Sequence, residues 1–274
     1  MGFGCNVPAI LATRMIESRK SRLITMLVTP LMSCSARLPV YIIFVAAFFP
    51  HHSGLVLMGL YLTGIILAVL VARLLSRTVM RGDETPYVME LTPYRRPAWK
   101  VIFKHTWDKG YEYLKKMGGM ILVASIVIWF LSYYPHSEHT PLHSEAHYEN
   151  SYLGRLGKAC QPVFEPLGLD WKAGVSLLSG VAAKEIIVST IGVLYAEEGE
   201  TGALAEKLTA SGDFNLASAL SFLVFVLLYF PCMATIAAIA SEAGWRWALG
   251  ALLYNTLVAW GVAWLFYQIG CLLI

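Results

Sequence analysis

Four long stretches of this sequence contain no Asp, Glu, Lys or Arg: residues 54–72, 117–137, 214–241 and 247–274. Each is long enough to cross the hydrocarbon core of a bilayer, which takes about 20 apolar residues. Only 14% of the residues are charged and 57% are hydrophobic, whereas roughly a quarter are charged in an ordinary soluble domain. We therefore expect an all-α polytopic membrane protein, since backbone polar groups in lipid must be satisfied within the segment.

Two further apolar stretches, residues 23–49 and 173–195, are interrupted by polar residues or proline. They are either broken spans or re-entrant elements, which brings the expected number of transmembrane helices to about five or six. We expect a first gate-like half, a basic cytoplasmic loop with an amphipathic helix and a linking span, a periplasmic loop and a second gate-like half. These segments cover residues 1–75, 76–134, 135–171 and 172–274, respectively.

The distribution of basic residues predicts the orientation. Ten of the 21 Lys and Arg lie between Arg73 and Lys116, and four more precede the first apolar stretch. Cytoplasmic loops carry such an excess, so both regions are expected inside, and residues 50–53 and 137–171 outside. Between residues 97 and 116, aromatic residues recur every three or four positions. This favours an amphipathic helix lying on the inner leaflet, with a docking surface for a cytoplasmic partner as the alternative.

The two interrupted regions share an order of features. Pro30-Leu31-Met32-Ser33 lies in the first and Pro231-Cys232-Met233-Ala234 in the second. A glycine-containing apolar element with polar insertions precedes each, GFGCNVPAI in one case and SGVAAKEIIVST in the other. The chain thus resembles two copies of one unit, and repeats with interrupted helices are typical of transporters. If residues 173–195 cross fully, the repeats are parallel and the carboxyl end is cytoplasmic; if they re-enter, the repeats are inverted and that end is outside.

Prolines within apolar stretches predict where an ion could be held. Proline removes a backbone donor, so we expect free carbonyls at Pro8, Pro30, Pro39 and Pro231. A cysteine lies within four residues of three of these prolines, and Asn, Ser and Thr lie beside the cysteines. Sulfur, oxygen and nitrogen ligands together suit a borderline divalent metal such as Fe²⁺, while the alternative for each cysteine is a small buried apolar side chain. The candidate ligands are Cys5, Cys34 and Cys232, with Asn6, Ser35 and Thr235 as secondary ligands.

Charged residues inside apolar segments are costly and need partners. Arg37, Lys184 and Glu185 are the three such residues. Lys184 and Glu185 are adjacent and point in different directions on a helix, so Glu185 is free to act as a cation ligand or proton acceptor; the alternative is a structural role for this pair.

Other sequence features are expected to be of less consequence. His136, His139, His143 and His147 are expected in a solvated loop, with an outer metal site as the alternative. The formal charge of +3 does not indicate nucleic-acid binding, the five scattered cysteines do not form a disulfide framework, and no phosphate-binding loop motif occurs. We therefore expect no enzyme activity in this chain.

Long motifs of the sequence resemble a known family. GFGCNVPAI and SRLITMLVTPLMSCSARLPVYIIF resemble the first gate region of ferrous iron transport protein B, and AAKEIIVST and YFPCMATIAAIASEAGWRWAL resemble segments that follow in that family in the same order. The resemblance covers nearly the whole chain. It implies a multi-pass Fe²⁺ transporter of the bacterial inner membrane, in which Cys5, Cys34 and Cys232 match the gate cysteines and Glu185 matches a charged gate element.

The resemblance also implies what accompanies this chain. Members of the family carry a GTP-binding domain and several spans before the GCNVPA motif, so we expect a carboxy-terminal part that does not transport on its own. The expected partners are membrane lipid, a separately encoded GTP-binding half, a small cytoplasmic accessory protein and further copies of the chain. Fe²⁺ is expected as the transported ion, with no permanently bound cofactor. The alternatives are a gate domain for nucleosides or other small solutes and a non-transporting membrane scaffold.

Overall fold

A computed structural model describes residues 3–78, 98–135, 145–195, 204–229 and 231–273, and all the regular elements in these ranges are helices. The first half contains α1, α2, α3 and α4, at Asn6–Ala12, Arg19–Val28, Leu38–Phe48 and Ser53–Thr78. The connecting part contains α5, α6 and α7, at Trp99–Tyr133, Glu145–Asn150 and Tyr152–Phe164. The second half contains α8 to α13, at Trp171–Ser179, Ile186–Leu194, Leu204–Ala210, Leu216–Leu228, Met233–Ala243 and Trp245–Leu273.

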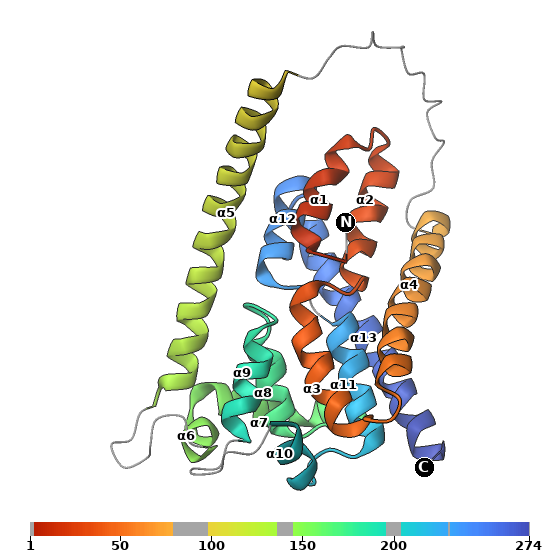
Figure 1. Cartoon of the computed structure of the whole chain (residues 1–274), viewed down its shortest axis with the longest axis vertical. Coiled ribbons are helices and arrows are strands. Elements are labelled where there is room, and N and C mark those ends of the chain that lie inside the picture. The colour runs from red at the N-terminus through yellow and green to blue at the C-terminus, as the bar shows by residue number, and fades with distance from the viewer. Residues whose placement is uncertain (1–2, 79–97, 136–144, 196–203, 230, 274) are drawn as a thin grey trace.

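The two halves repeat one arrangement in opposite directions (Figure 1). In the first, α2 runs from the upper end to the middle, α3 continues to the lower end and α4 returns. In the second, α11 runs from the lower end to the middle, α12 continues to the upper end and α13 returns. We call the upper end, which holds the basic turn at residues 13–22, the inner end, and the lower end the outer end. The repeats are therefore inverted, which was one of the two arrangements that the sequence left open.

Residues 173–195 form a hairpin and do not cross the molecule. Helices α8 and α9 pack against each other, and both extend to the outer end while their connection, residues 180–185, lies at mid-height (Figure 1). Gly180 makes this turn possible, because a Cβ atom there would lie 2.4 Å from a side-chain carbon of Ile187 and 2.6 Å from the hydroxyl of Tyr229. The element is re-entrant, as in transporters whose broken elements meet near the membrane centre.

The prolines interrupt the chain at two of the four expected places. Pro30 lies in the short 3₁₀ helix η2, Thr29–Leu31, that separates α2 from α3, and Pro231 lies between α11 and α12. The expectation for Pro8 and Pro39 is wrong, since both lie in the first turn of a helix, α1 and α3 respectively. The N–H groups of a first helical turn have no partner within the helix, so proline there frees no carbonyl.

Helix α11 is the centre of the core. Nearly all of its residues are buried, as expected for a helix that is apolar on every side. An Asn215–Ser218 capping box fixes its start. Phe222 stacks on Phe44 of α3 with ring centroids 4.6 Å apart, and Phe214 meets Phe44 edge-on at 5.3 Å. These aromatic contacts join the two halves near the outer end.

Helix α5 differs from what the sequence predicted. The expected amphipathic helix and the following span form one continuous helix of 35 residues, so an interfacial helix lying in the membrane plane is wrong. At about 1.5 Å per residue this helix is roughly 50 Å long and extends well beyond a hydrocarbon core of about 30 Å. Its basic part therefore continues the span toward the inner side. Five helical segments of the described residues are long and apolar enough to cross a membrane, which confirms a polytopic membrane protein.

Candidate ion pathway between the two halves

At mid-height, each helix break is bonded to the glycine-containing turn of its own half. The backbone N–H and the hydroxyl of Ser35 both donate to the carbonyl oxygen of Gly4, at 3.0 and 2.8 Å. In the second half, the N–H of Met233 donates to the carbonyl oxygen of Val181, at 3.1 Å. The two inverted halves thus make the same kind of contact between a helix break and a preceding turn.

Arg37 binds carbonyl groups released by the first break. Its side chain is buried, and its guanidinium donates to the carbonyl oxygen of Met32 at 3.0 Å and to that of Pro30 at 3.3 Å. Its Nε has no hydrogen-bond partner among the described residues. The expectation that an intramembrane arginine needs partners is therefore confirmed, and the partners are backbone oxygens that the proline-containing turn leaves outside the helical ladder.

Lys184 has a different kind of partner in the second half. Its ammonium group lies 3.3 Å from the centre of the Tyr229 ring, and the side chain is 2% exposed. A cation over an aromatic face is stabilised by the ring quadrupole, and more strongly where water is excluded. The Tyr229 hydroxyl in turn donates to the carbonyl oxygen of Leu177, at 3.2 Å. Lys184 and Tyr229 thus join the turn of the α8–α9 hairpin to the end of α11.

The three candidate cysteines lie around this central region. Cys5 is the N-cap residue of α1, Cys34 lies between two 3₁₀ turns, and Cys232 is the N-cap residue of α12. The sulfur of Cys5 lies 4.0 Å from the hydroxyl of Tyr113 in α5, and Cys34 and Cys232 both lie near Lys184. In the described part of the chain, however, no three His, Cys, Asp or Glu residues are close enough to hold one ion together. Among the described residues, the three cysteines are therefore separate thiols.

The secondary candidates occupy the same segments. Asn6 is 5% exposed, and its Oδ1 has no hydrogen-bond partner among the described residues, so it can accept a ligand. Thr235 is buried, with its hydroxyl 3.2 Å from the sulfur of Cys232. Ser35 binds Gly4, as described above. Glu185 is exposed and is the N-cap residue of α9, one turn before Ser189, which lines a cavity against α5.

The remaining cysteines and histidines lie elsewhere. Cys160 is in α7 and Cys271 near the end of α13, and all five cysteines are free thiols. His147 is buried in α6, with its ring 6.2 Å from that of Tyr133. His136, His139 and His143 lie outside the described residues.

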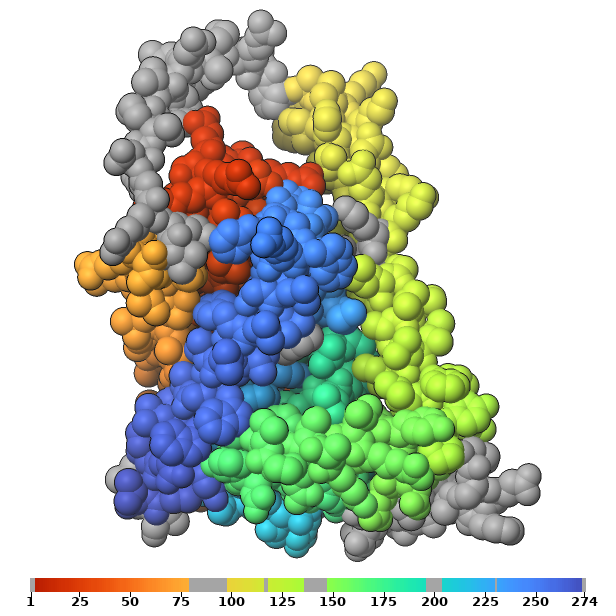
Figure 2. Space-filling view, turned by 180° about the vertical axis from the view of Figure 1, so that it is seen from behind, coloured from red at the N-terminus to blue at the C-terminus, as the bar shows by residue number. Residues whose placement is uncertain are grey.

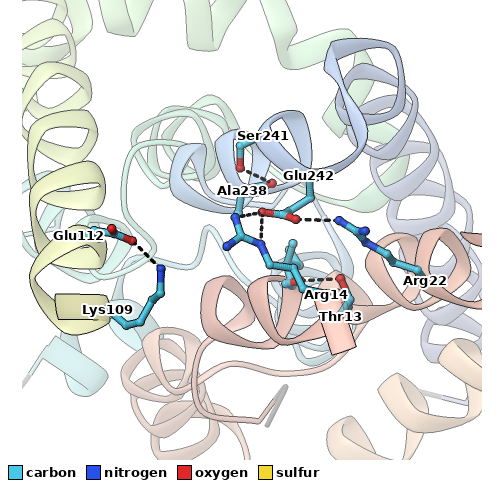
Figure 3. Close-up of polar contacts among 9 residues, drawn as sticks. Thr13, Arg14, Arg22, Lys109, Glu112, Ala238, Ser241 and Glu242 are labelled. Carbon is cyan, nitrogen blue, oxygen red and sulfur yellow. Dashed lines mark hydrogen bonds and ion pairs between the residues drawn. The ribbon is translucent and has the colours of Figure 1, made fainter. Parts of the chain in front are cut away.

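Sequence reasoning missed an ion cluster at the inner end (Figure 3). The carboxylate of Glu242, in the last turn of α12, accepts from Nε of Arg14 at 2.8 Å, from Nη2 of the same arginine, and from Nη2 of Arg22 at 2.8 Å. The side chain of Glu242 is 4% exposed. Its hydrogen bond and charge raise the pKa of Arg14, which stays a cation. The cluster joins α12 of the second half to the α1–α2 turn and to the first turn of α2 in the first half.

A signal for this cluster was present in the sequence. Glu242 is the only acidic residue after Asp213, and it follows a long stretch without charge. An isolated carboxylate at the end of an apolar helix needs a cationic partner, and the arginines before residue 23 were available. These arginines therefore have a second role beside membrane orientation, as ion-pair partners of Glu242.

Comparison with known proteins identifies the family. The Gate family, described as nucleoside recognition, matches residues 1–48 and 114–246, and the family "Ferrous iron transport protein B C terminus" matches residues 57–109. The comparison with solved structures found no match.

Several curated relatives are similar over most or all of the chain. A Fe(2+) transport protein A/Fe(2+) transporter FeoB fusion protein of Porphyromonas gingivalis is 49% identical, over 99% of this chain and 37% of its own length. The Fe(2+) transporter FeoB of Methanocaldococcus jannaschii is 40% identical, over 100% of this chain and 41% of its own length. The Fe(2+) transporter FeoB of Campylobacter jejuni is 44% identical, over 89% of this chain and 41% of its own length. The chain thus spans about two fifths of the length of these relatives; it belongs to the Gate family and corresponds to the carboxy-terminal membrane portion of ferrous iron transport protein B.

Proposed function

We propose that this chain forms the membrane pathway of a Fe²⁺ transporter in the bacterial inner membrane. The observation that carries the proposal is that Cys5, Cys34 and Cys232 each lie at a helix start or break where the two inverted halves meet. Thiol and thiolate sulfur favours Fe²⁺ over Na⁺ or Mg²⁺, which prefer oxygen ligands. The names of the curated relatives support the same ion.

In this proposal the ion passes from one ligand to the next. A permeating ion must be bound strongly enough to enter and weakly enough to leave. Single thiols assisted by Asn6 Oδ1, Ser35 and Thr235 give incomplete coordination at each step, which suits release. Arg37 is a buried cation beside this region and opposes a resident divalent ion. Glu185 is proposed as a further cation ligand, at the exposed side of the hairpin turn.

The activity is proposed to need a GTP-binding part that this chain does not contain. The sequence has no phosphate-binding loop, and the relatives are more than twice as long. An accessory protein is also proposed, because one relative is named as a fusion of Fe(2+) transport protein A with FeoB. This chain would then supply the pathway, and its partners the nucleotide switch.

A nucleoside-type substrate is the second candidate, because the matching Gate family is described as nucleoside recognition. A nucleoside site needs several fixed amide, hydroxyl and carboxylate groups around one cavity. The central region instead offers separate thiols and two buried basic side chains, so Fe²⁺ is the better proposal.

Uptake measurements in transport-deficient cells distinguish these candidates. The chain is expressed with a GTP-binding part from a relative, and uptake of radiolabelled Fe²⁺ and of a radiolabelled nucleoside is measured under reducing conditions. Fe²⁺ uptake that depends on both parts is expected. Nucleoside uptake alone would favour the second candidate, and uptake of neither solute with both parts present in the membrane would favour a scaffold.

A further inference from the structure

A long groove separates α5 from the rest of the molecule. A cavity of about 950 Å³ lies at the inner end between α5, α1 and α12, and a second of about 580 Å³ lies deeper, between α5 and the turn of the α8–α9 hairpin. Met120 lines both, so the two cavities adjoin each other along one face of α5. The space-filling view shows α5, in yellow and yellow-green, running beside α12, in blue (Figure 2). No described residue of α5 is buried.

The chemistry of the groove changes along its length. Arg14, Lys109 and Glu112 line the inner cavity together with apolar residues and small residues of α12. The deeper cavity is lined by apolar side chains and glycine, among them Val123 and Val127. One end can therefore bind charged groups, and the other can accept only hydrocarbon.

The change from a charged to an apolar lining along the groove matches the headgroup and acyl chains of an inner-leaflet lipid. The charged end of the groove faces the inner side, which the basic residues assign to the cytoplasm, and its apolar end reaches the hairpin turn at mid-height. From Lys109 to Ile128 the groove follows about 28 Å of helix. One leaflet with its headgroups is roughly 20 Å thick, so a phospholipid fits with its headgroup at Lys109 and its acyl chains along Val123 and Val127.

The charged end of the groove contains an exchangeable ion pair. The Nζ of Lys109 lies 3.0 Å from a carboxylate oxygen of Glu112, and the two side chains are 64% and 68% exposed (Figure 3). Such exposed pairs contribute only about 0–1 kcal/mol, so a headgroup with both charges can replace the contact. Its phosphate would bind the ammonium of Lys109, and its amine would bind the carboxylate of Glu112.

We propose that the groove between α5 and the α1–α12 pair is a binding site for one zwitterionic, amine-bearing phospholipid of the inner leaflet. The bound lipid fills the space beside α5 and fixes its position against α12. The site borders the cysteine region, since Val181 and Met233 line its deeper end, but the proposal does not depend on the identity of the transported solute.

The test uses the chain reconstituted into vesicles of equimolar phosphatidylethanolamine and phosphatidylglycerol, then released in mild detergent and weighed by native mass spectrometry. The unmodified chain should retain one phosphatidylethanolamine. Ala237 lines the inner cavity, so Ala237→Trp fills it and should reduce retention at least several-fold. Val69→Trp, on the exposed face of α4, is the matched control and should retain the lipid. A photoreactive phosphatidylethanolamine should crosslink to residues 119–128.

The headgroup preference gives a second readout that does not depend on a bulky substitution. Glu112→Gln removes the partner of the amine and should shift retention several-fold toward phosphatidylglycerol. Lys109→Gln should weaken retention of both lipids, while Lys104→Gln, on the same helix but outside the cavity lining, should change neither. The proposal is overturned if the unmodified chain retains no phospholipid, if Ala237→Trp retains as much as Val69→Trp, or if Glu112→Gln leaves the preference unchanged.

Discussion

The ammonium group of Lys184 lies 3.3 Å from the ring centre of Tyr229, and this contact joins the re-entrant hairpin to the break that follows α11. The two residues are far apart in the sequence. Lys184 is buried. Without the ring, the buried Lys184 side chain would lose this contact. The stability of the central region should therefore depend on this tyrosine.

Substitution of Tyr229 tests this dependence. Tyr229→Leu removes the ring and the hydroxyl bond to Leu177, and should destabilise the protein by about 2–4 kcal/mol. Tyr229→Phe keeps the ring and should cost only about 1 kcal/mol. The measurement is the temperature at which the detergent-solubilised chain loses its monodisperse elution peak.

Tyr254 provides the control for these variants. Its hydroxyl is buried and has no hydrogen-bond partner among the described residues, so Tyr254→Phe should leave the transition unchanged or raise it. If Tyr229→Leu is no less stable than Tyr229→Phe, the cation–ring contact has no energetic role.

The Glu242 cluster should control access from the inner side. Glu242→Gln removes the charge that holds Arg14 and Arg22, so α12 and the α1–α2 turn should separate more readily. In inverted vesicles, with the other cysteines replaced, a membrane-impermeant thiol reagent should then modify Cys232 several-fold faster.

A double substitution and a control make this test specific. Arg22→Gln should have a similar but smaller effect, because Arg14 still binds Glu242, and adding it to Glu242→Gln should change little, as expected for residues in one cluster. Lys104→Gln removes an exposed charge of α5 outside the cavity lining and should not alter the rate. Unchanged labelling of Cys232 in Glu242→Gln would exclude a closing role for the cluster.

Labelling from outside the cell tests the inverted arrangement. In a cysteine-free background, His52→Cys and Ser211→Cys lie at the outer end and should react with an impermeant thiol reagent, while Lys100→Cys should be protected. All three positions are exposed. Ser211 decides the question, because it would lie inside if residues 173–195 crossed the membrane. Protection of Ser211→Cys in intact cells would therefore rule out the re-entrant hairpin.

Much of the fold followed from the sequence because charge-free stretches have few alternatives in a membrane. The spans around α4, α11–α12 and α13 were predicted, as was the interruption at Pro30 and Pro231. The roles of Pro8 and Pro39 could not be read from composition, since a proline acts differently in the first turn of a helix than in its interior. The sequence also did not predict that α5 is one continuous helix. Its basic part has the same helical period whether it lies in the plane of the membrane or continues the span.

The sequence predicted which residues form the candidate site, but it did not predict the contacts that these residues make. Cys34 and Cys232 could be singled out from their neighbouring prolines, but the bonds from Ser35 to Gly4 and from Met233 to Val181 depend on the inverted packing of the halves. The Glu242 cluster joins residues more than 200 positions apart. Only the tertiary arrangement brings these residues together at the inner end.

The central claim is that cysteines at the helix breaks carry Fe²⁺. Cysteine-to-serine substitution keeps the size of the side chain and removes the soft donor, so a packing cysteine should tolerate it with less than about 1.5 kcal/mol lost. Cys160, in α7 and away from the breaks, is the matched control. Glu185→Gln tests the proposed carboxylate ligand without changing its shape.

The most direct measurement is the initial rate of radiolabelled Fe²⁺ uptake, under reducing conditions, in cells that contain this chain together with a GTP-binding part at equal membrane abundance. We predict that Cys34→Ser and Cys232→Ser each lower the rate at least several-fold, that Cys5→Ser and Glu185→Gln also lower it, and that Cys160→Ser leaves it unchanged. Equal rates in all five variants would contradict the claim and place the pathway elsewhere in the molecule.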